Sequence, residues 1–301
     1  MSMKNNIIIA LGLVILGFTA QAQQMPQYTQ YLMNSYVINP ATAGVNPYFE
    51  AKLNHREQWV GIGGAPSTYT ANFHSAIGRG VGLGVSFIKD DIGPVSDTSG
   101  FIDISYMIPV SRKGKLSFGL KAGGSMFSVG RIDSDEQTSL NPDTTQFFPN
   151  IGAGIFYHTD VFYFGASSPN FIKAKHIDRD NKAKASEIEH YFLTSGYVFN
   201  ASENLKVKPS TLFKLAAGAP VSIDLSLNAM FYERFELGVS HRLDDSWSGT
   251  FNFLATNKLR LGYAYDHTIS ELNGFNRGSH EFMILYRIPL TSRNIKSPRF
   301  F

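Results

Sequence analysis

Residues Val221 to Tyr232 read VSIDLSLNAMFY. The apolar residues of this stretch occupy every second position from Val221 to Phe231, and the positions between them up to Asn228 hold serine, aspartate, serine and asparagine. A period of two places these two sets on opposite faces of a β-strand. The stretch therefore predicts a strand with one apolar and one polar face.

The same alternation recurs along most of the chain. It predicts 14 strands, which start near residues 49, 67, 80, 98, 114, 148, 161, 190, 205, 221, 235, 246, 259 and 279. The least regular are 161–168 and 205–216, and the second contains Pro209. Proline cannot donate to a strand ladder and usually marks an edge or a bulge.

Strand length and loop length favour a membrane barrel over a soluble sandwich. The predicted strands run to about 9–12 residues, whereas soluble strands average about 5–6 and a tilted transmembrane strand needs about 9–11. Short connections alternate with longer, charged ones, as in barrels with short periplasmic turns and long outside loops. The longer ones are Lys89–Asp97, Gly130–Phe147, Pro169–Glu189 and His267–Gly278, although Ala216–Pro220 and Leu243–Asp245 would be short outside loops.

Aromatic residues also gather at the ends of the apolar stripes, where the rings of membrane barrels lie at the level of the lipid headgroups. We predict an all-β, antiparallel transmembrane barrel of about 14 strands in a bacterial outer membrane; a soluble exported sandwich is the alternative.

Composition excludes several classes of function. The 301 residues include no cysteine, so disulfides, thiolate catalysis and cysteine-ligated zinc are ruled out. Lysine and arginine number 27 against 24 acidic residues, a net charge of +3, without the clustered basic excess that nucleic-acid binding needs. We expect no nucleic-acid partner.

The N-terminus reads as a secretory signal peptide. A short polar start with Lys4 precedes a 12-residue apolar run, Ile7 to Phe18, and the small-x-small sequence Ala20-Gln21-Ala22. We expect residues 1–22 to be removed, residues 23–47 to form an N-terminal segment, residues 48–289 to form the barrel and residues 290–301 to be a tail. Two alternatives stay open for the segment, which is polar and interrupted by Asn39-Pro40 and Asn46-Pro47. It either fills the barrel or hangs in the periplasm as a loose arm.

Charges of both signs fall on the inward face of the predicted strands. A selective pore usually shows one sign at its constriction, so the mixture indicates a lumen cross-linked by ion pairs or filled by a segment. The inward set is Glu50, Lys52, Arg56, Asp103, Lys121, Lys206, Lys208, Asp224, Glu236, Arg242, Arg260, Asp266, Glu281 and Arg287.

The common catalytic and metal-binding patterns are missing from the sequence, which favours a protein that is not an enzyme and needs no cofactor. Neither a G-x-S-x-G nor an H-E-x-x-H pattern occurs. A lipid hydrolase with a dyad of His74 and Ser75 or Ser86 can be drawn, but neighbours in a strand point to opposite faces, which argues against the first pair.

The acidic residues Asp133, Asp135, Glu136 and Asp143 share one predicted outside loop and could supply oxygen ligands to calcium. A solvated acidic loop is the commoner explanation of such a cluster.

Several local motifs resemble the PorP/SprF family, barrel components of the type IX secretion system of Bacteroidetes. They are dense before residue 125 and thin in the middle of the chain. The motifs are Gln24–Tyr31 (QMPQYTQY), Asn34, Asn39–Gly44 (NPATAG), Arg56–Gly61 (REQWVG), Gly64–Thr68 (GAPST), Asp90–Pro94 (DDIGP), Leu116–Leu120 (LSFGL) and Ser297–Phe301 (SPRFF).

The resemblance implies an outer-membrane barrel that helps to secrete large proteins with C-terminal sorting domains, such as gliding adhesins, or to hold them at the surface. Its implied partners are outer-membrane lipid, such a secreted protein and, for one type of member, secretion components beneath the membrane. A pore for small solutes is the alternative function.

By the resemblance alone, six residues are candidates for partner binding or lumen architecture: Tyr28, Asn39, Pro40, Arg56, Gln58 and Trp59. Arg56 and Gln58 share the polar face of the first strand and could bond the N-terminal segment. Trp59 has the opposite parity, so anchoring in the aromatic belt explains it equally well.

Overall fold

The computed structural model describes residues 25–130, 145–172, 189–216 and 218–290, and these residues form one antiparallel sheet and a single short helix. The helix is the 3-10 turn η1, Pro40–Thr42. Among the described residues, no helix is long and apolar enough to cross a membrane. The strands are β1 Tyr48–Glu57, β2 Ser67–Gly78, β3 Val81–Ile92, β4 Val95–Pro109, β5 Lys115–Val129, β6 Gln146–His158, β7 Phe162–Ser168, β8 His190–Tyr197, β9 Phe199–Ser202, β10 Leu205–Ala216, β11 Ser222–Phe231, β12 Phe235–Arg242, β13 Ser246–Leu254, β14 Leu259–Thr268 and β15 Ser279–Pro289.

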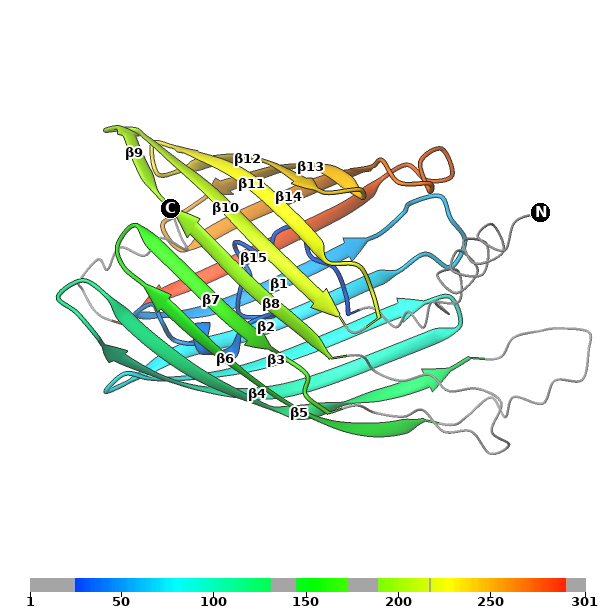
Figure 1. Ribbon diagram of the computed structural model, residues 1–301, viewed down its shortest axis with the longest axis horizontal. Coiled ribbons are helices and arrows are strands. Elements are labelled where there is room, and N and C mark those ends of the chain that lie inside the picture. The colour runs from blue at the N-terminus through cyan, green and yellow to red at the C-terminus, as the bar shows by residue number, and fades with distance from the viewer. Residues whose placement is uncertain (1–24, 131–144, 173–188, 217, 291–301) are drawn as a thin grey trace, which may run out of the picture.

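The sheet formed by the described residues closes on itself through the pairings of β10 with β11 and of β15 with β1 (Figure 1). Strands that are neighbours in sequence pair with each other except β8 and β9, which both pair with β10, and β1 also pairs with β15. Closure gives every wall strand two partners, which the absence of water in the bilayer core demands. The predicted fold is confirmed: the wall is an antiparallel barrel of 14 strands, in which β8 and β9 count as one.

The break between β8 and β9 has a local cause in Pro209. β10 pairs with β8 from Ser210 onwards and with β9 up to Val207, so the interruption at Val198 lies opposite Lys208, directly beside the proline. Proline has no N–H to offer to the neighbouring strand at this point. The N–H of Val198 donates to Val161 O at 2.7 Å. The irregularity predicted at Pro209 is therefore present.

The two faces of the strands divide as the alternation predicts. Along β11, Leu225 and Leu227 are about half exposed on the outer surface, whereas Asp224, Ser226 and Asn228 are buried inside. The outer surface is a continuous apolar wall with no counterpart in a soluble monomer of this size. Its exposed apolar side chains include Leu53, Phe87, Ile102, Ile104, Leu120, Ile151, Leu193, Leu237, Val239, Trp247, Phe251, Phe282 and Ile284.

The barrel has a turn end and a loop end. At the turn end β2–β3, β4–β5, β6–β7, β11–β12 and β13–β14 are joined by short turns, and β1 begins and β15 finishes there. The loop end holds the connections β1–β2, β5–β6, β7–β8 and β14–β15. One predicted loop there, Lys89–Asp97, is wrong: β3 and β4 extend to a two-residue turn at Gly93 and Pro94. The charges that suggested a loop are strand residues near the barrel mouth.

The N-terminal segment, residues 25–46, lies inside the barrel, where Figure 1 shows its dark-blue path enclosed by the strands. It starts at the loop end, where Thr29 meets β14 and β15, and descends to the turn end, where it joins β1. Most of its residues from Tyr28 to Asn46 are buried. Of the two alternatives left open by the sequence, the structure therefore shows the filled lumen.

Candidate functional site: the filled lumen

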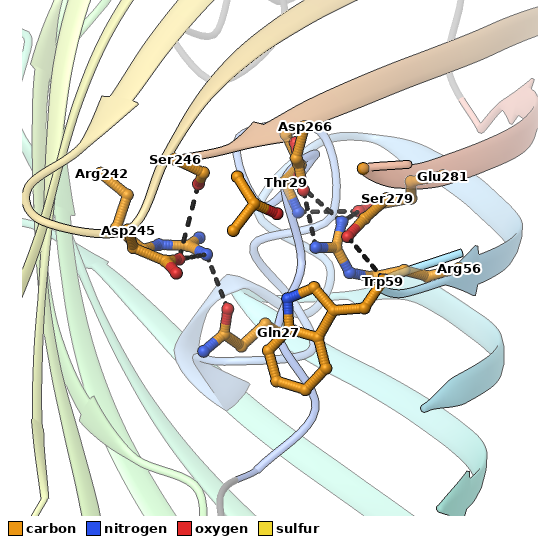
Figure 2. Close-up of polar contacts among 12 residues, drawn as sticks. Gln27, Thr29, Arg56, Trp59, Arg242, Asp245, Ser246, Asp266, Ser279 and Glu281 are labelled. Carbon is orange, nitrogen blue, oxygen red and sulfur yellow. Dashed lines mark hydrogen bonds and ion pairs between the residues drawn. The ribbon is translucent and has the colours of Figure 1, made fainter. Parts of the chain in front are cut away.

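A buried arginine at the loop end holds the start of the segment. Arg56 on β1 reaches Asp266 of β14 at 2.6 Å and Glu281 of β15 at 3.1 Å, and it donates to Thr29 Oγ1 at 2.8 Å (Figure 2). Thr29 completes the network, because its N–H donates to Glu281 at 2.7 Å and its hydroxyl to Asp266 at 2.6 Å. We call these four residues the Arg56 cluster.

The Arg56 cluster depends on all of its charges. The side chains of Arg56, Asp266 and Glu281 are at most 4% exposed. Burying charges is expensive unless they are paired and hydrogen-bonded, and removal of one partner leaves the others uncompensated. The planar guanidinium can serve two carboxylates and a hydroxyl at once, which the single ammonium of a lysine cannot do in the same geometry.

A second arginine holds the segment two residues earlier. Arg242 at the end of β12 donates to Gln27 Oε1 at 2.6 Å and pairs with Asp245 at 3.1 Å (Figure 2). It also pairs with Asp224 at 2.7 Å. Gln27 and Thr29 are thus attached to β12 and to β14–β15. The start of the segment is therefore held along one arc of the wall, from β12 to β1.

Tyrosine hydroxyls attach the middle of the segment to the wall. Tyr28 lies 3.1 Å from Thr70 Oγ1, Tyr31 lies 3.2 Å from Ser226 Oγ, and Tyr36 donates to Asp103. Their rings fill the space between the strands while their hydroxyls satisfy polar wall residues, as buried tyrosines require.

The helix η1 lies against the wall near the turn end. Asn39 caps it by accepting from Ala41 N at 3.0 Å and donates through Nδ2 to Ile155 O of β6 at 3.0 Å. Pro40 occupies the first helical position, where its missing N–H is not needed. On β5, a Cβ at Gly119 would lie 2.1 Å from Ala41 N, so only glycine permits this close approach.

The six residues singled out by resemblance divide into two groups. Tyr28, Asn39, Pro40 and Arg56 are buried and belong to the contact between segment and wall. Gln58 and Trp59 follow β1 at the mouth: the N–H of Gln58 donates to Pro66 O at 2.9 Å, and the N–H of Trp59 to Ser279 Oγ at 3.1 Å.

Trp59 does not follow the parity of β1, because its backbone has left the strand with a φ of 48°. Figure 2 shows its indole turned from the wall toward the interior of the barrel, on the side of Gln27. A position at the mouth of the lumen therefore describes Trp59 better than the aromatic belt does.

The partners of Arg56 were visible in the sequence only as members of the inward charged set. Other members of that set are also paired within the lumen: Lys52 and His74 with Glu50, Lys121 with Asp103, and Arg260 with Glu236. The imidazole of His74 lies 3.2 Å from Glu50 Oε2, and it accepts from Gly44 N at 3.4 Å. Ser75 donates instead to Ala76 O.

No group of His, Asp or Glu side chains suited to a metal ion occurs within the described ranges. The calcium candidates Asp133, Asp135 and Asp143 lie outside them, as does Glu136.

The protein is a transmembrane β-barrel filled by its own N-terminal segment, because it has an apolar outer wall, a closed sheet and a polar lumen. Two solved structures share the architecture. The toluene transporter TbuX of Ralstonia pickettii is 11% identical, with 88% of this chain and 94% of that chain covered and a TM-score of 0.52. The CymD monoaromatic hydrocarbon channel is 12% identical, with the same shares covered and a TM-score of 0.54. Identities this low establish the fold alone.

The family model of the type IX secretion system membrane protein PorP/SprF matches residues 20–286. The chain belongs to this family, and it is an outer-membrane β-barrel. No curated protein sequence matches it.

Proposed function

We propose that this barrel assists the secretion or surface attachment of a large protein with a C-terminal sorting domain, such as a gliding adhesin, and acts as a binding partner rather than as an enzyme. The observation that carries the proposal is the occupied lumen of a type IX secretion membrane protein. A segment held inside the barrel by Arg56 and Arg242 leaves the protein suited to binding rather than to free diffusion of solutes.

The loop end is the surface that supports partner binding. It carries the long connections of the barrel and faces outward if the short turns lie in the periplasm, as is usual for outer-membrane barrels. The turn end, with the start of β1, would then face periplasmic secretion components. An adhesin-specific role predicts mainly the secreted surface protein as partner, whereas a role in the core machinery predicts mainly the periplasmic secretion components.

Recovery of the barrel with its partners tests the proposal. Affinity-tagged protein, extracted from outer membranes in mild detergent, should recover a large surface protein with a C-terminal sorting domain, or secretion components. Deleting the gene should remove particular proteins from the cell surface. An untouched surface proteome together with recovery of neither class would refute the proposed function.

A pore for small solutes is the rival function, and it is in keeping with the two structural neighbours, of which TbuX is a toluene transporter and CymD a monoaromatic hydrocarbon channel. Single-channel recording in planar bilayers separates the two. The proposed function predicts little conductance for the intact chain, whereas a solute pore conducts steadily.

A further inference from the structure

A cavity of about 290 Å³ lies inside the loop end, between the N-terminal segment and strands β3 to β8. Its wall is mainly apolar, and its rim includes Ile92 and Val95, which flank the turn between β3 and β4. Pockets for whole drug-sized ligands run from about 300 to 1,000 Å³. This cavity therefore suits one long side chain or a small molecule of similar size. Its apolar lining includes Met25, Val37, Ile88, Ile92, Val95, Phe101 and Phe127.

Two carboxylates face each other in this apolar wall. Asp90 of β3 and Asp97 of β4 are direct cross-strand partners, and both line the cavity. Asp90 is 8% exposed and accepts from Thr68 Oγ1 at 2.6 Å, and Asp97 accepts from Ser99 Oγ at 3.0 Å. Like charges directly opposite each other destabilise a sheet. Within the described residues neither carboxylate has a salt-bridge partner, in contrast to the paired acids elsewhere in the lumen.

A third acceptor points to a ligand independently of these two acids. Asn150 of β6 lines the same cavity, is 9% exposed, and its Oδ1 has no hydrogen-bond partner among the described residues. An unsatisfied buried acceptor costs about 1–3 kcal/mol unless a donor reaches it. The cavity thus offers acceptors that a donor from a ligand could satisfy.

The basic groups of the cavity do not neutralise Asp90 and Asp97. Lys121 is engaged with Asp103 at 3.4 Å and lies over the ring of Phe101. Lys121 is also about 20 Å along β5 from Phe127, the register partner of Asp97, at about 3.3 Å per residue. His190, on β8, lines the cavity as well, and its ring stacks on Phe192.

We propose that this cavity receives a lysine or arginine side chain of a peptide that enters from the loop end. The cation would lie between Asp90 and Asp97, and its apolar stem would pack on Ile88 and Phe127. Another hydrogen-bond donor of the same peptide would reach Asn150 Oδ1. The proposal rests on the proposed function, because it makes the peptide a part of the secreted partner. A free amine such as a polyamine shares the same chemistry, and the experiments below distinguish the two sources.

The cysteine-free chain allows a direct test of the charge preference. Ile88→Cys places a single thiol in the cavity beside Asp90, and Asn273→Cys on the exposed β14–β15 connection serves as the reference. The measured quantity is the ratio of two reaction rates, that of the cationic reagent aminoethyl methanethiosulfonate over that of its anionic sulfonatoethyl analogue. We expect this ratio to be about tenfold higher at the cavity thiol than at the reference thiol. Asp90→Asn combined with Asp97→Asn should abolish this excess. Equal ratios at the two thiols in the intact background would overturn the proposal.

Binding of a defined peptide to the whole barrel tests the occupant. The probe is a dye-labelled, end-capped peptide with one lysine between two phenylalanines, and its control has norleucine in place of lysine. We expect the lysine peptide to bind at least about tenfold more tightly, a difference of about 1.4 kcal/mol. Asp90→Asn should remove that difference, and the matched Asp91→Asn, next along β3, should keep it.

Three outcomes overturn the assignment: equal binding of the two peptides, equal effects of the two aspartate substitutions, or displacement of the probe by cadaverine as effectively as by unlabelled peptide. Gel mobility before and after heating verifies that each variant is a folded barrel. These measurements use purified barrel and synthetic probes, so their failure is distinguishable from failure to recover a partner from cells.

Discussion

Arg56 holds the start of the N-terminal segment against the wall, because one guanidinium serves Asp266, Glu281 and Thr29. We expect Arg56→Met to lower the free energy of unfolding by about 3–5 kcal/mol, since it leaves two buried carboxylates uncompensated. The free energy of unfolding of Arg56→Lys should fall between those of Arg56→Met and the unaltered protein, because lysine keeps the charge but lacks the planar set of guanidinium donors. Urea unfolding in detergent, followed by tryptophan fluorescence, measures both.

Arg277→Met is the matched control for Arg56. Arg277 is exposed on the β14–β15 connection, and its backbone N–H donates to Val60 O. Its substitution removes the same charge and should change stability by less than about 0.5 kcal/mol. Indistinguishable stabilities of the two methionine variants would show that the Arg56 cluster contributes nothing net.

The sequence predicted Arg56 but not its partners. Alternation along the first strand placed it on the inward face, and the family resemblance singled it out. Its contacts join residues separated by 210 and 225 positions in the chain, to Asp266 and Glu281, and such pairings depend on barrel closure and register. No local pattern contains that information. Trp59 was unpredictable for the opposite reason, since its backbone leaves the strand where parity stops applying.

At the scale of elements, the strands were predictable because each one separates lipid from a polar lumen, and that separation is written at period two. Length was less predictable where charged residues continue a strand, as between Lys89 and Asp97. The course of the N-terminal segment was not predictable, because it has no period and takes its shape from the wall around it. The packing of this segment against the wall can be tested by substitution.

We expect Gly119→Ala to displace η1 from β5, because the new methyl group would lie 2.1 Å from Ala41 N and 2.4 Å from Pro40 C. Backbone on both sides leaves no flexible side chain to yield, and overpacking of this kind typically costs about 1–3 kcal/mol. Unfolding by urea gives the stability, and limited proteolysis gives the exposure of the N-terminal segment.

Gly249→Ala supplies the comparison for Gly119. Gly249 lies on β13, and a methyl group added there would have nothing within 4 Å, so alanine should be tolerated. If Gly119→Ala were as stable and as protease-resistant as Gly249→Ala, η1 could not be packed against β5 as described.

At the scale of the whole molecule, the barrel and its filling are separate structures with separate sources of stability. The wall is stabilised by hydrogen bonds between strands and by its apolar outer face, neither of which includes the segment. The filling depends on polar contacts such as those of Gln27 and Thr29 with the wall. Removing the filling should therefore leave a barrel that still inserts into membranes but no longer blocks them.

Deletion of residues 25–46, with the signal peptide and the start of β1 retained, tests this separation. In planar bilayers the intact chain should show little current, and the deleted form should carry a steady current, because the freed lumen is lined by charges of both signs that hold water. The Gly119→Ala variant should carry a fluctuating current of intermediate size, since the substitution loosens one contact of the segment while Arg56 and Arg242 still hold the other end. Steady conductance by the intact chain would show that the segment does not close the lumen, and the solute-pore function would then replace the binding function proposed for this barrel.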